Sequence, residues 1–172
     1  MIKQICFLIL CCALTVTVNA QSPPAVNPLQ IGKKAPVLEF KDMDGKPVSL
    51  EYLKGNVIVL NFWNIGCKGC EKERETLNWL SDSLKGQPIK FVSITLNSKE
   101  KMTDWLAKHP INYEFVGNVD FMGIAGPSFF NYRCMPTTVV IDHNGVVQYN
   151  QCGPIIGKEN GNKFANLLTK WQ

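Results

Sequence analysis

Residues 56–70 read NVIVLNFWNIGCKGC, and this stretch decides the fold. Its first eight residues are dominated by β-branched and aromatic side chains, which is typical of a strand buried on both faces. From residue 67 the apolar period becomes helical, with Leu77, Leu80 and Leu84 at spacings of three and four. The sequence therefore predicts a buried strand that runs directly into a helix, with two cysteines at the junction.

Other segments predict further strands and helices around this unit. N-terminal to it, two short extended segments flank an Asp44-Gly45 turn, which predicts a β-hairpin. C-terminal to it, the patterns predict a strand over 89–96, a helix over 99–109, an extended segment over 113–116, a hairpin of strands 137–142 and 146–151 over His143-Asn144-Gly145, and a closing helix over 159–170. This order predicts an α/β fold with a central mixed β-sheet flanked by helices and an extra N-terminal β-hairpin.

The first twenty residues predict a targeting signal rather than part of the fold. A basic start is followed by an apolar run over 5–18 and by small residues ending at Ala20, the pattern of a cleaved secretory signal peptide. At ~1.5 Å per residue the apolar run spans roughly 21 Å, short of the ~30 Å hydrocarbon core. We therefore expect a signal peptide over 1–20, an extended leader over 21–30, and one domain over 31–172 in the periplasm. The alternative is a domain that stays anchored in the membrane and faces the periplasm.

Composition excludes several classes of function. The net charge of +4, from 18 basic and 14 acidic residues, is scattered along the chain, which gives no basic patch for nucleic acid. With only two histidines, a histidine-rich metal site is not expected. Cleavage after Ala20 would remove three of the seven cysteines and leave four in an oxidising compartment: Cys67, Cys70, Cys134 and Cys152.

The spacing of Cys67 and Cys70 predicts a redox-active dithiol. Two cysteines three apart in the first turn of a helix bring their sulfur atoms within bonding distance. Unpaired backbone N–H groups and the helix dipole favour a thiolate at the first cysteine, and Lys68 adds a cation beside it. We therefore expect Cys67 to be the nucleophile and Cys70, one turn deeper, to resolve the mixed disulfide.

Two other interpretations of this pair are a structural disulfide and half of a zinc site. A zinc site normally needs a second pair of ligands at comparable spacing. Cys134 and Cys152 are eighteen residues apart, and neither histidine lies near a CxxC pair. The sequence therefore predicts no metal and no other cofactor.

Two separated motifs resemble those of thioredoxin-like proteins. Residues 61–70 are similar to the strand-to-helix active site of that superfamily, and Met135-Pro136-Thr137 resembles its cis-proline loop running into a strand. With the leading hairpin and the signal peptide, the chain is most similar to the TlpA/ResA-like branch of periplasmic thiol-disulfide oxidoreductases. The resemblance covers the chain from about Ile31 to the end.

The resemblance implies roles for individual residues. Cys67 and Cys70 would form the redox pair, and Pro136 would be a cis proline whose loop binds a substrate strand. Glu73 matches the acidic residue that this branch places near the resolving sulfur, and Asn61 stands where many thioredoxins hold a buried aspartate. A half-buried carboxylate with a raised pKa can carry a proton to and from a buried sulfur. The alternative for Glu73 is an ordinary solvated acid in the first turn of a helix.

The motif departs from the family pattern at three positions. Gly66 replaces a common tryptophan, Gly69 replaces a common proline, and Glu75 stands where this branch often has a proline. These departures leave the dithiol intact, but they bear on redox potential and on the choice of partner.

Three interpretations of the second cysteine pair stay open. If Asn144-Gly145 forms a two-residue turn, Cys152 lies opposite Thr137, which places Cys134 roughly 10 Å further along a strand at ~3.3 Å per residue. A disulfide tolerates Cα separations up to ~7 Å, so a bridge requires a bend at Pro136 or a bulge. The other interpretations are two buried thiols, or a Cys134 that exchanges with Cys67.

The leading prediction is an exported thiol-disulfide oxidoreductase that acts on disulfide-containing envelope proteins as a monomer. Proteins of this branch more often act as reductants and receive their electrons from a membrane thiol-reducing partner. Lys68 favours the opposite direction, because stabilising the thiolate makes a dithiol more oxidising. One alternative is a thiol peroxidase of the peroxiredoxin type, which requires a threonine shortly before its cysteine; residues 61–66 contain none. Another is a non-enzymatic copper-delivery protein, but proteins of that kind carry a CxxxC motif, whereas this chain has CxxC.

Overall fold

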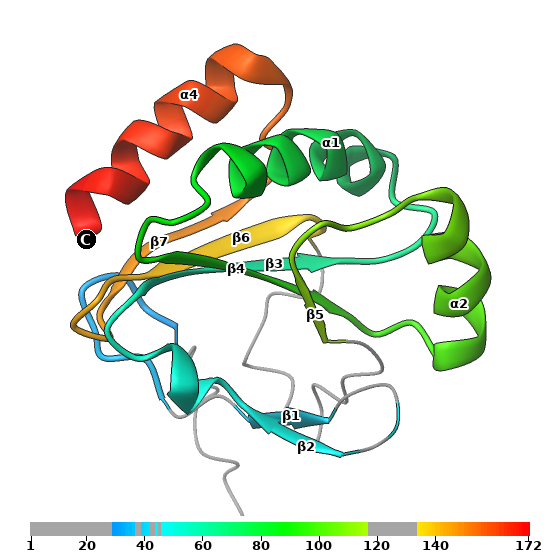
Figure 1. Cartoon of the computed structure of the whole chain (residues 1–172), viewed down its shortest axis with the longest axis horizontal. Helices are drawn as coiled ribbons and strands as arrows, with labels where there is room; N and C mark the ends of the chain where they lie inside the picture. Colours follow the sequence, from blue (N-terminus) through cyan, green and yellow to red (C-terminus); the bar gives the residue numbers. More distant parts are fainter. Residues whose placement is uncertain (1–28, 37–38, 42–43, 45, 117–133) are drawn as a thin grey trace, which may run out of the picture.

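The computed structural model describes residues 29–36, 39–41, 44, 46–116 and 134–172 (Figure 1). The predicted signal peptide and residues 21–28 of the leader lie outside the described residues, as does Gly45 of the predicted turn. The elements are β1 (Glu39–Lys41), β2 (Pro47–Ser49), η1 (Leu50–Leu53), β3 (Val57–Trp63), α1 (Lys68–Ser83), β4 (Ile89–Thr95), α2 (Lys99–Lys108), β5 (Glu114–Val116), β6 (Thr137–Ile141), β7 (Val147–Cys152), α4 (Gly157–Leu168) and η3 (Thr169–Trp171).

A five-stranded mixed sheet lies at the centre, with strand order β5-β4-β3-β6-β7. Strand β3 pairs in parallel with β4 and antiparallel with β6, and β7 pairs antiparallel with β6. Helices α1 and α4 cover one face of the sheet, and the β1–β2 hairpin lies beyond the other face (Figure 1). The predicted mixed sheet, its flanking helices and the N-terminal hairpin are therefore confirmed.

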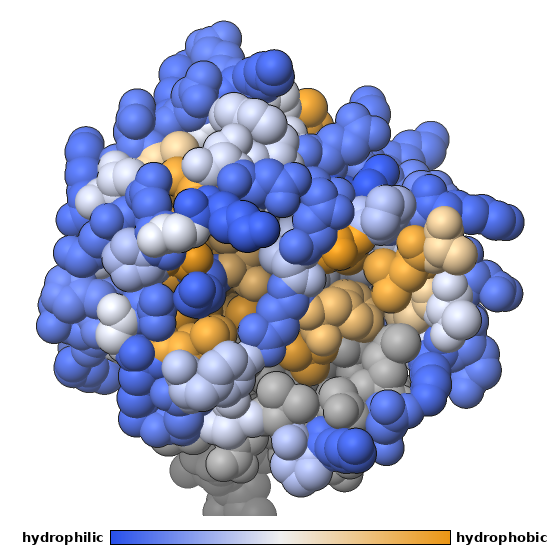
Figure 2. All heavy atoms as spheres, in the orientation of Figure 1, coloured by the Kyte–Doolittle hydropathy of each residue, from blue (hydrophilic) through white to orange (hydrophobic). Residues whose placement is uncertain are grey.

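Strand β3 is buried along its whole length, as its composition predicts. Val57 and Val59 pack with Leu77 and Leu80 of α1. Ile58 and every second residue after it in the strand join the core on the other face of the sheet. Seen from the side shown in Figure 1, the molecular surface is mostly polar, and apolar side chains gather near the middle of that side (Figure 2). The central position of β3 fixes the place where α1 begins.

The turn between β6 and β7 has three residues, as the predicted strand ends at 142 and 146 require, and not the two residues of a turn confined to Asn144-Gly145. The loop spans three residues between Asp142 and Val146, whose backbone N–H and C=O pair at 2.9 Å, and it includes Asn144 and Gly145. The carboxylate of Asp142 accepts the N–H groups of Asn144 and Val146, which stabilises the longer loop. A register shift after Val140 compensates for the extra residue.

The chain packs against the sheet just before the predicted domain start at residue 31. Leu29, in the predicted leader, is completely buried in the core. After it, the chain runs along β7, where Gly32 N–H donates to the Val147 carbonyl at 2.8 Å and Val147 N–H donates to the Lys33 carbonyl at 2.9 Å. No helix within the described part of the chain has the length and apolar character needed to cross a membrane.

Candidate active site

The junction of β3 and α1 is a short loop held by the end of β4. Asn97 accepts the backbone N–H of Ile65 at 2.9 Å, and the Asn64 side chain accepts the Thr95 hydroxyl at 3.2 Å. Gly66 follows with a φ of +85°, a left-handed conformation that glycine adopts at little cost. A tryptophan at this position would be strained, which gives a physical reason for that departure from the family pattern.

Cys67 is the N-cap of α1 and is bonded to Cys70. The two Cα atoms lie 5.2 Å apart, and Cys70 N–H donates to Cys67 Sγ at 3.2 Å. Cys67 is partly exposed, whereas Cys70 is only 4% exposed. The predicted difference in depth between the two cysteines is confirmed, and it leaves Cys67 as the more accessible one.

The second motif lies directly against this disulfide. The Met135–Pro136 peptide bond is cis, as the resemblance implies, and Thr137 begins β6 immediately after it. The Met135 carbonyl oxygen lies 3.5 Å from Cys67 Sγ, close enough to accept the thiol proton in the dithiol state. The structure therefore brings the predicted cis-proline loop to the predicted nucleophile.

Gly69 allows close packing between α1 and this loop. A Cβ atom at Gly69 would lie 3.3 Å from Pro136 Cδ and 3.5 Å from Pro154 Cγ. On the other side of the loop, the Pro136 carbonyl accepts Gly153 N–H at 2.9 Å. The glycine that replaces the family's proline thus lets a loop after β7 approach the helix start.

Glu73 is buried, with 1% of its surface exposed, so the interpretation as a solvated acid is wrong. Its carboxylate accepts the Asn61 side-chain amide at 2.8 Å and the Ile155 backbone N–H at 2.9 Å. Burial raises the pKa of Glu73 to about 7, although these hydrogen bonds, with a smaller one from Thr138, act in the opposite direction. At neutral pH this carboxyl group can therefore both give and take a proton.

Sequence reasoning missed the backbone groups and one side chain that complete the site. Ile155 N–H and the ring of Pro154 come from a loop with no recognisable motif, and backbone donors leave no signal in a sequence. Arg74 lines a small cavity beside Cys70. Its spacing of four from that cysteine was the available signal, because residues i and i+4 share one side of a helix.

Cys134 and Cys152 are also bonded, with a Cα separation of 5.8 Å. The predicted register, with Thr137 opposite Cys152, is confirmed. The expected gap of roughly 10 Å is wrong because the chain bends at Met135 and Pro136 instead of continuing as a strand. The structure therefore contradicts two separate buried thiols, and the disulfide fastens the cis-proline loop to the end of β7.

Among the described residues, no group of three or more His, Cys, Asp or Glu side chains is placed to hold a metal ion. Two disulfides, rather than a ligand cluster, account for the four cysteines of the domain.

A CxxC pair at the start of a helix, a cis proline against it and a buried acid below it define a thioredoxin-like dithiol site. The chain belongs to the AhpC/TSA family, whose model matches residues 31–150. Among its relatives, the thiol-disulfide oxidoreductase ResA of a Bacillus cereus strain is 29% identical over 168 residues, covering 98% of this chain and 94% of that protein. The thiol:disulfide interchange protein DsbE of Yersinia pestis is 28% identical over 163 residues, covering 92% and 84%.

A solved structure with a similar fold comes from the same kind of protein. A crystal structure of a DsbE-type thiol:disulfide interchange protein from Chlorobium tepidum superposes with a TM-score of 0.69 at 24% identity, covering 83% of this chain and 97% of that one. The predicted thioredoxin-like fold and the resemblance to the ResA-like branch are confirmed. The relatives are thiol-disulfide oxidoreductases, the class of enzyme that the sequence predicts.

Proposed function

We propose that this protein is exported and reduces disulfides of other envelope proteins through Cys67. The observation that carries the proposal is the unequal exposure of the two bonded cysteines, with the more exposed one beside the cis-proline loop. Of these two cysteines, Cys67 is the one open to a protein substrate, and Cys70 is held next to it to release that substrate.

The reaction follows from this arrangement. In the dithiol state, the Cys67 thiolate attacks one sulfur of a substrate disulfide, a mixed disulfide forms, and the other substrate sulfur leaves and takes a proton. Cys70 then loses its proton and attacks Cys67 Sγ, which releases the second substrate thiol. Two electrons pass to the substrate, and the protein is left as the Cys67–Cys70 disulfide. A membrane thiol-reducing partner returns the two electrons and two protons.

Glu73 is the proposed proton carrier for Cys70. It lies one turn after that cysteine on α1, it is shielded from bulk water, and its pKa of about 7 suits transfer in both directions. Glu71 and Glu75 are exposed and have no such role.

Export rests on residues 1–20 and on the four cysteines, which pair in two disulfides in the described domain. The mass of the mature protein tests it: cleavage after Ala20 leaves a chain that begins at Gln21. A chain that keeps residues 1–20 when recovered from cells would instead support the membrane-anchored alternative.

Trapping of mixed disulfides tests the assignment of roles. We expect Cys70→Ala to accumulate mixed disulfides with envelope proteins through Cys67, because the resolving thiol is missing. Cys67→Ala serves as the matched variant and should trap few. Full insulin-reducing activity in Cys67→Ala would show that the nucleophile has been assigned to the wrong cysteine.

A further inference from the structure

Cys70 shares a small cavity with a cation. Cys70 and Arg74 are one turn apart on α1 and line a cavity of about 10 Å³, which has room for about one water molecule. The remaining walls are formed by Asn61, Trp63, Trp105, Ile111 and Tyr113. Charges separated by such a cavity are screened much less than charges at the surface.

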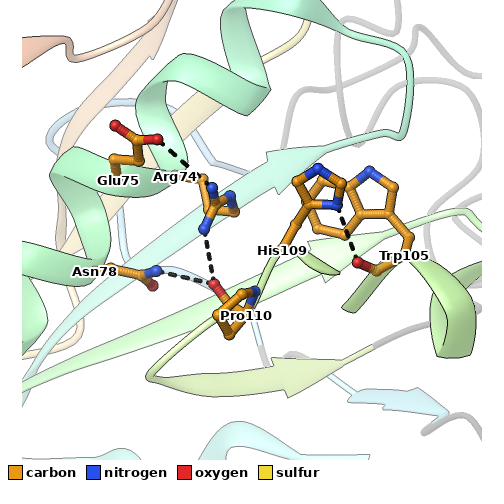
Figure 3. A network of polar contacts seen from close by, with 6 residues as sticks. All are labelled: Arg74, Glu75, Asn78, Trp105, His109 and Pro110. Atoms are coloured by element: carbon orange, nitrogen blue, oxygen red, sulfur yellow. Dashed lines mark hydrogen bonds and ion pairs between the residues drawn. The ribbon is translucent and has the colours of Figure 1, made fainter. Parts of the chain in front are cut away.

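Two ends of the Arg74 guanidinium are already occupied (Figure 3). Nη1–H donates to the Pro110 carbonyl at 3.0 Å, and the same oxygen accepts the Asn78 side-chain amide at 2.9 Å. Nη2 lies 3.8 Å from Glu75, whose side chain is 80% exposed, so this ion pair is weak. The contact with Pro110 holds the group in one orientation.

The third end of the guanidinium is buried without a hydrogen-bond acceptor among the described residues. This atom is Nε, and it carries one N–H. A buried donor left unpaired costs about 1–3 kcal/mol, so its retention calls for an explanation. Cys70 lines the same cavity, and its sulfur becomes an anion when the disulfide opens.

We propose that Arg74 is a positioning residue that stabilises the Cys70 thiolate, directly or through one water molecule. The proposal rests on the dithiol exchange proposed above. In the step concerned, an external thiolate attacks Cys67 Sγ, a bond forms between those sulfur atoms, and the Cys67–Cys70 bond breaks. The bonding pair of electrons leaves with Cys70 Sγ, so the negative charge moves from the external sulfur into the cavity beside Arg74.

The other titratable groups around Cys70 do not supply this charge. Glu73 turns its carboxylate toward Asn61 and the Ile155 backbone. Burial raises the pKa of Tyr113, so its hydroxyl stays neutral. His109 stacks on Trp105 at a ring-centroid distance of 4.5 Å and does not line the cavity.

Cys67 is the reaction partner of Cys70. Among the described residues that line the cavity, Arg74 is therefore the only charged one.

Titration of Cys70 tests the proposal without requiring enzyme activity. In a Cys67→Ala background, the ultraviolet absorbance of the thiolate reports the pKa of Cys70. We expect Arg74→Met to raise that pKa by about one unit or more, the effect of losing a nearby opposite charge. Arg74→Lys keeps the charge and should raise it less. Lys72→Met removes the same charge from an exposed position of the same helix and should leave it unchanged.

A rate measurement adds a second readout in the otherwise wild-type protein. Reduction of the Cys67–Cys70 disulfide by excess dithiothreitol, followed by tryptophan fluorescence, should slow about threefold in Arg74→Met for one unit of leaving-group pKa. Arg74→Gln replaces Arg74→Met if that variant does not fold. An unchanged Cys70 pKa together with a lower unfolding midpoint would overturn the proposal and leave Arg74 as a link between α1 and Pro110. Failure of the trapping experiment would count against the proposed function, whereas the titration would still stand.

Discussion

Replacing Glu73 by glutamine should change the stability of the protein in a way that depends on pH. Relative to wild type, the variant should gain unfolding free energy as the pH rises. In the folded protein, burial raises the pKa of Glu73 from 4.5 to about 7. Between these two values the unfolded chain loses the proton while the folded protein keeps it, so the free energy of unfolding falls as pH rises. Above about pH 7 both states are ionised and the loss is complete. The substituted glutamine has no proton to lose and avoids this penalty.

The magnitude follows from the two pKa values. A shift of about 2.5 units at about 1.4 kcal/mol per unit corresponds to between about 3 and 4 kcal/mol of lost stability at high pH, of which roughly a quarter is already lost at pH 5. We therefore expect the difference in unfolding free energy between Glu73→Gln and wild type to rise by about 2–3 kcal/mol from about pH 5 to about pH 8. The change with pH is the diagnostic quantity, because a constant offset also contains the altered hydrogen bonds to Asn61 and Ile155.

Urea denaturation at the two pH values, followed by tryptophan fluorescence, measures this difference. Glu75→Gln is the matched control, because it makes the same change two residues away on an exposed side chain. Its difference from wild type should stay constant with pH. If Glu73→Gln and Glu75→Gln behaved alike, the folded-state pKa of Glu73 would be ordinary and the proposed proton carrier would lose its basis.

Three further predictions concern the second disulfide, the helix contact and the redox potential. Replacing both Cys134 and Cys152 by Ala should lower the unfolding free energy by about 3 kcal/mol, because the bridge closes a loop with a separation of 18 residues; an unchanged urea midpoint would contradict this. Gly161→Ala should destabilise by about 1–3 kcal/mol despite the better helix propensity of alanine, since the new Cβ would lie 2.8 Å from the Trp79 ring. Asn162→Ala, on the exposed side of the same helix, should show no such loss in thermal unfolding. At equilibrium with glutathione, the active dithiol of a reductant should lie below about −200 mV, and a value near about −120 mV would indicate an oxidant instead.

The order of strands and helices could be predicted from the sequence because it depends on local patterns. Strand β3 is apolar on both faces, and α1 carries leucines at helical spacing, so their junction at Cys67 was fixed by residue types alone. The difference in exposure between Cys67 and Cys70 followed from their place in the first turn. Family resemblance, rather than residue pattern, supplied the cis bond at Pro136.

The remaining features depend on contacts between distant segments. The burial of Glu73 requires a loop from the far end of the chain, and that loop contributes a backbone N–H from Ile155. The approach of Cys134 to Cys152 requires a bend whose direction no local pattern specifies. The orientation of Arg74 depends on the carbonyl of Pro110, 36 residues away.

The loop at residues 153–156 has a consequence for mutagenesis of the active site. Gly153 N–H donates a hydrogen bond to the Pro136 carbonyl, and Ile155 N–H donates one to the Glu73 carboxylate. One short segment therefore restrains both the cis-proline loop and the buried acid. Substitutions at these sites share partners, and their free-energy changes will therefore not add. Thermodynamic double-mutant cycles, rather than single substitutions, are needed to apportion the energetics of this centre.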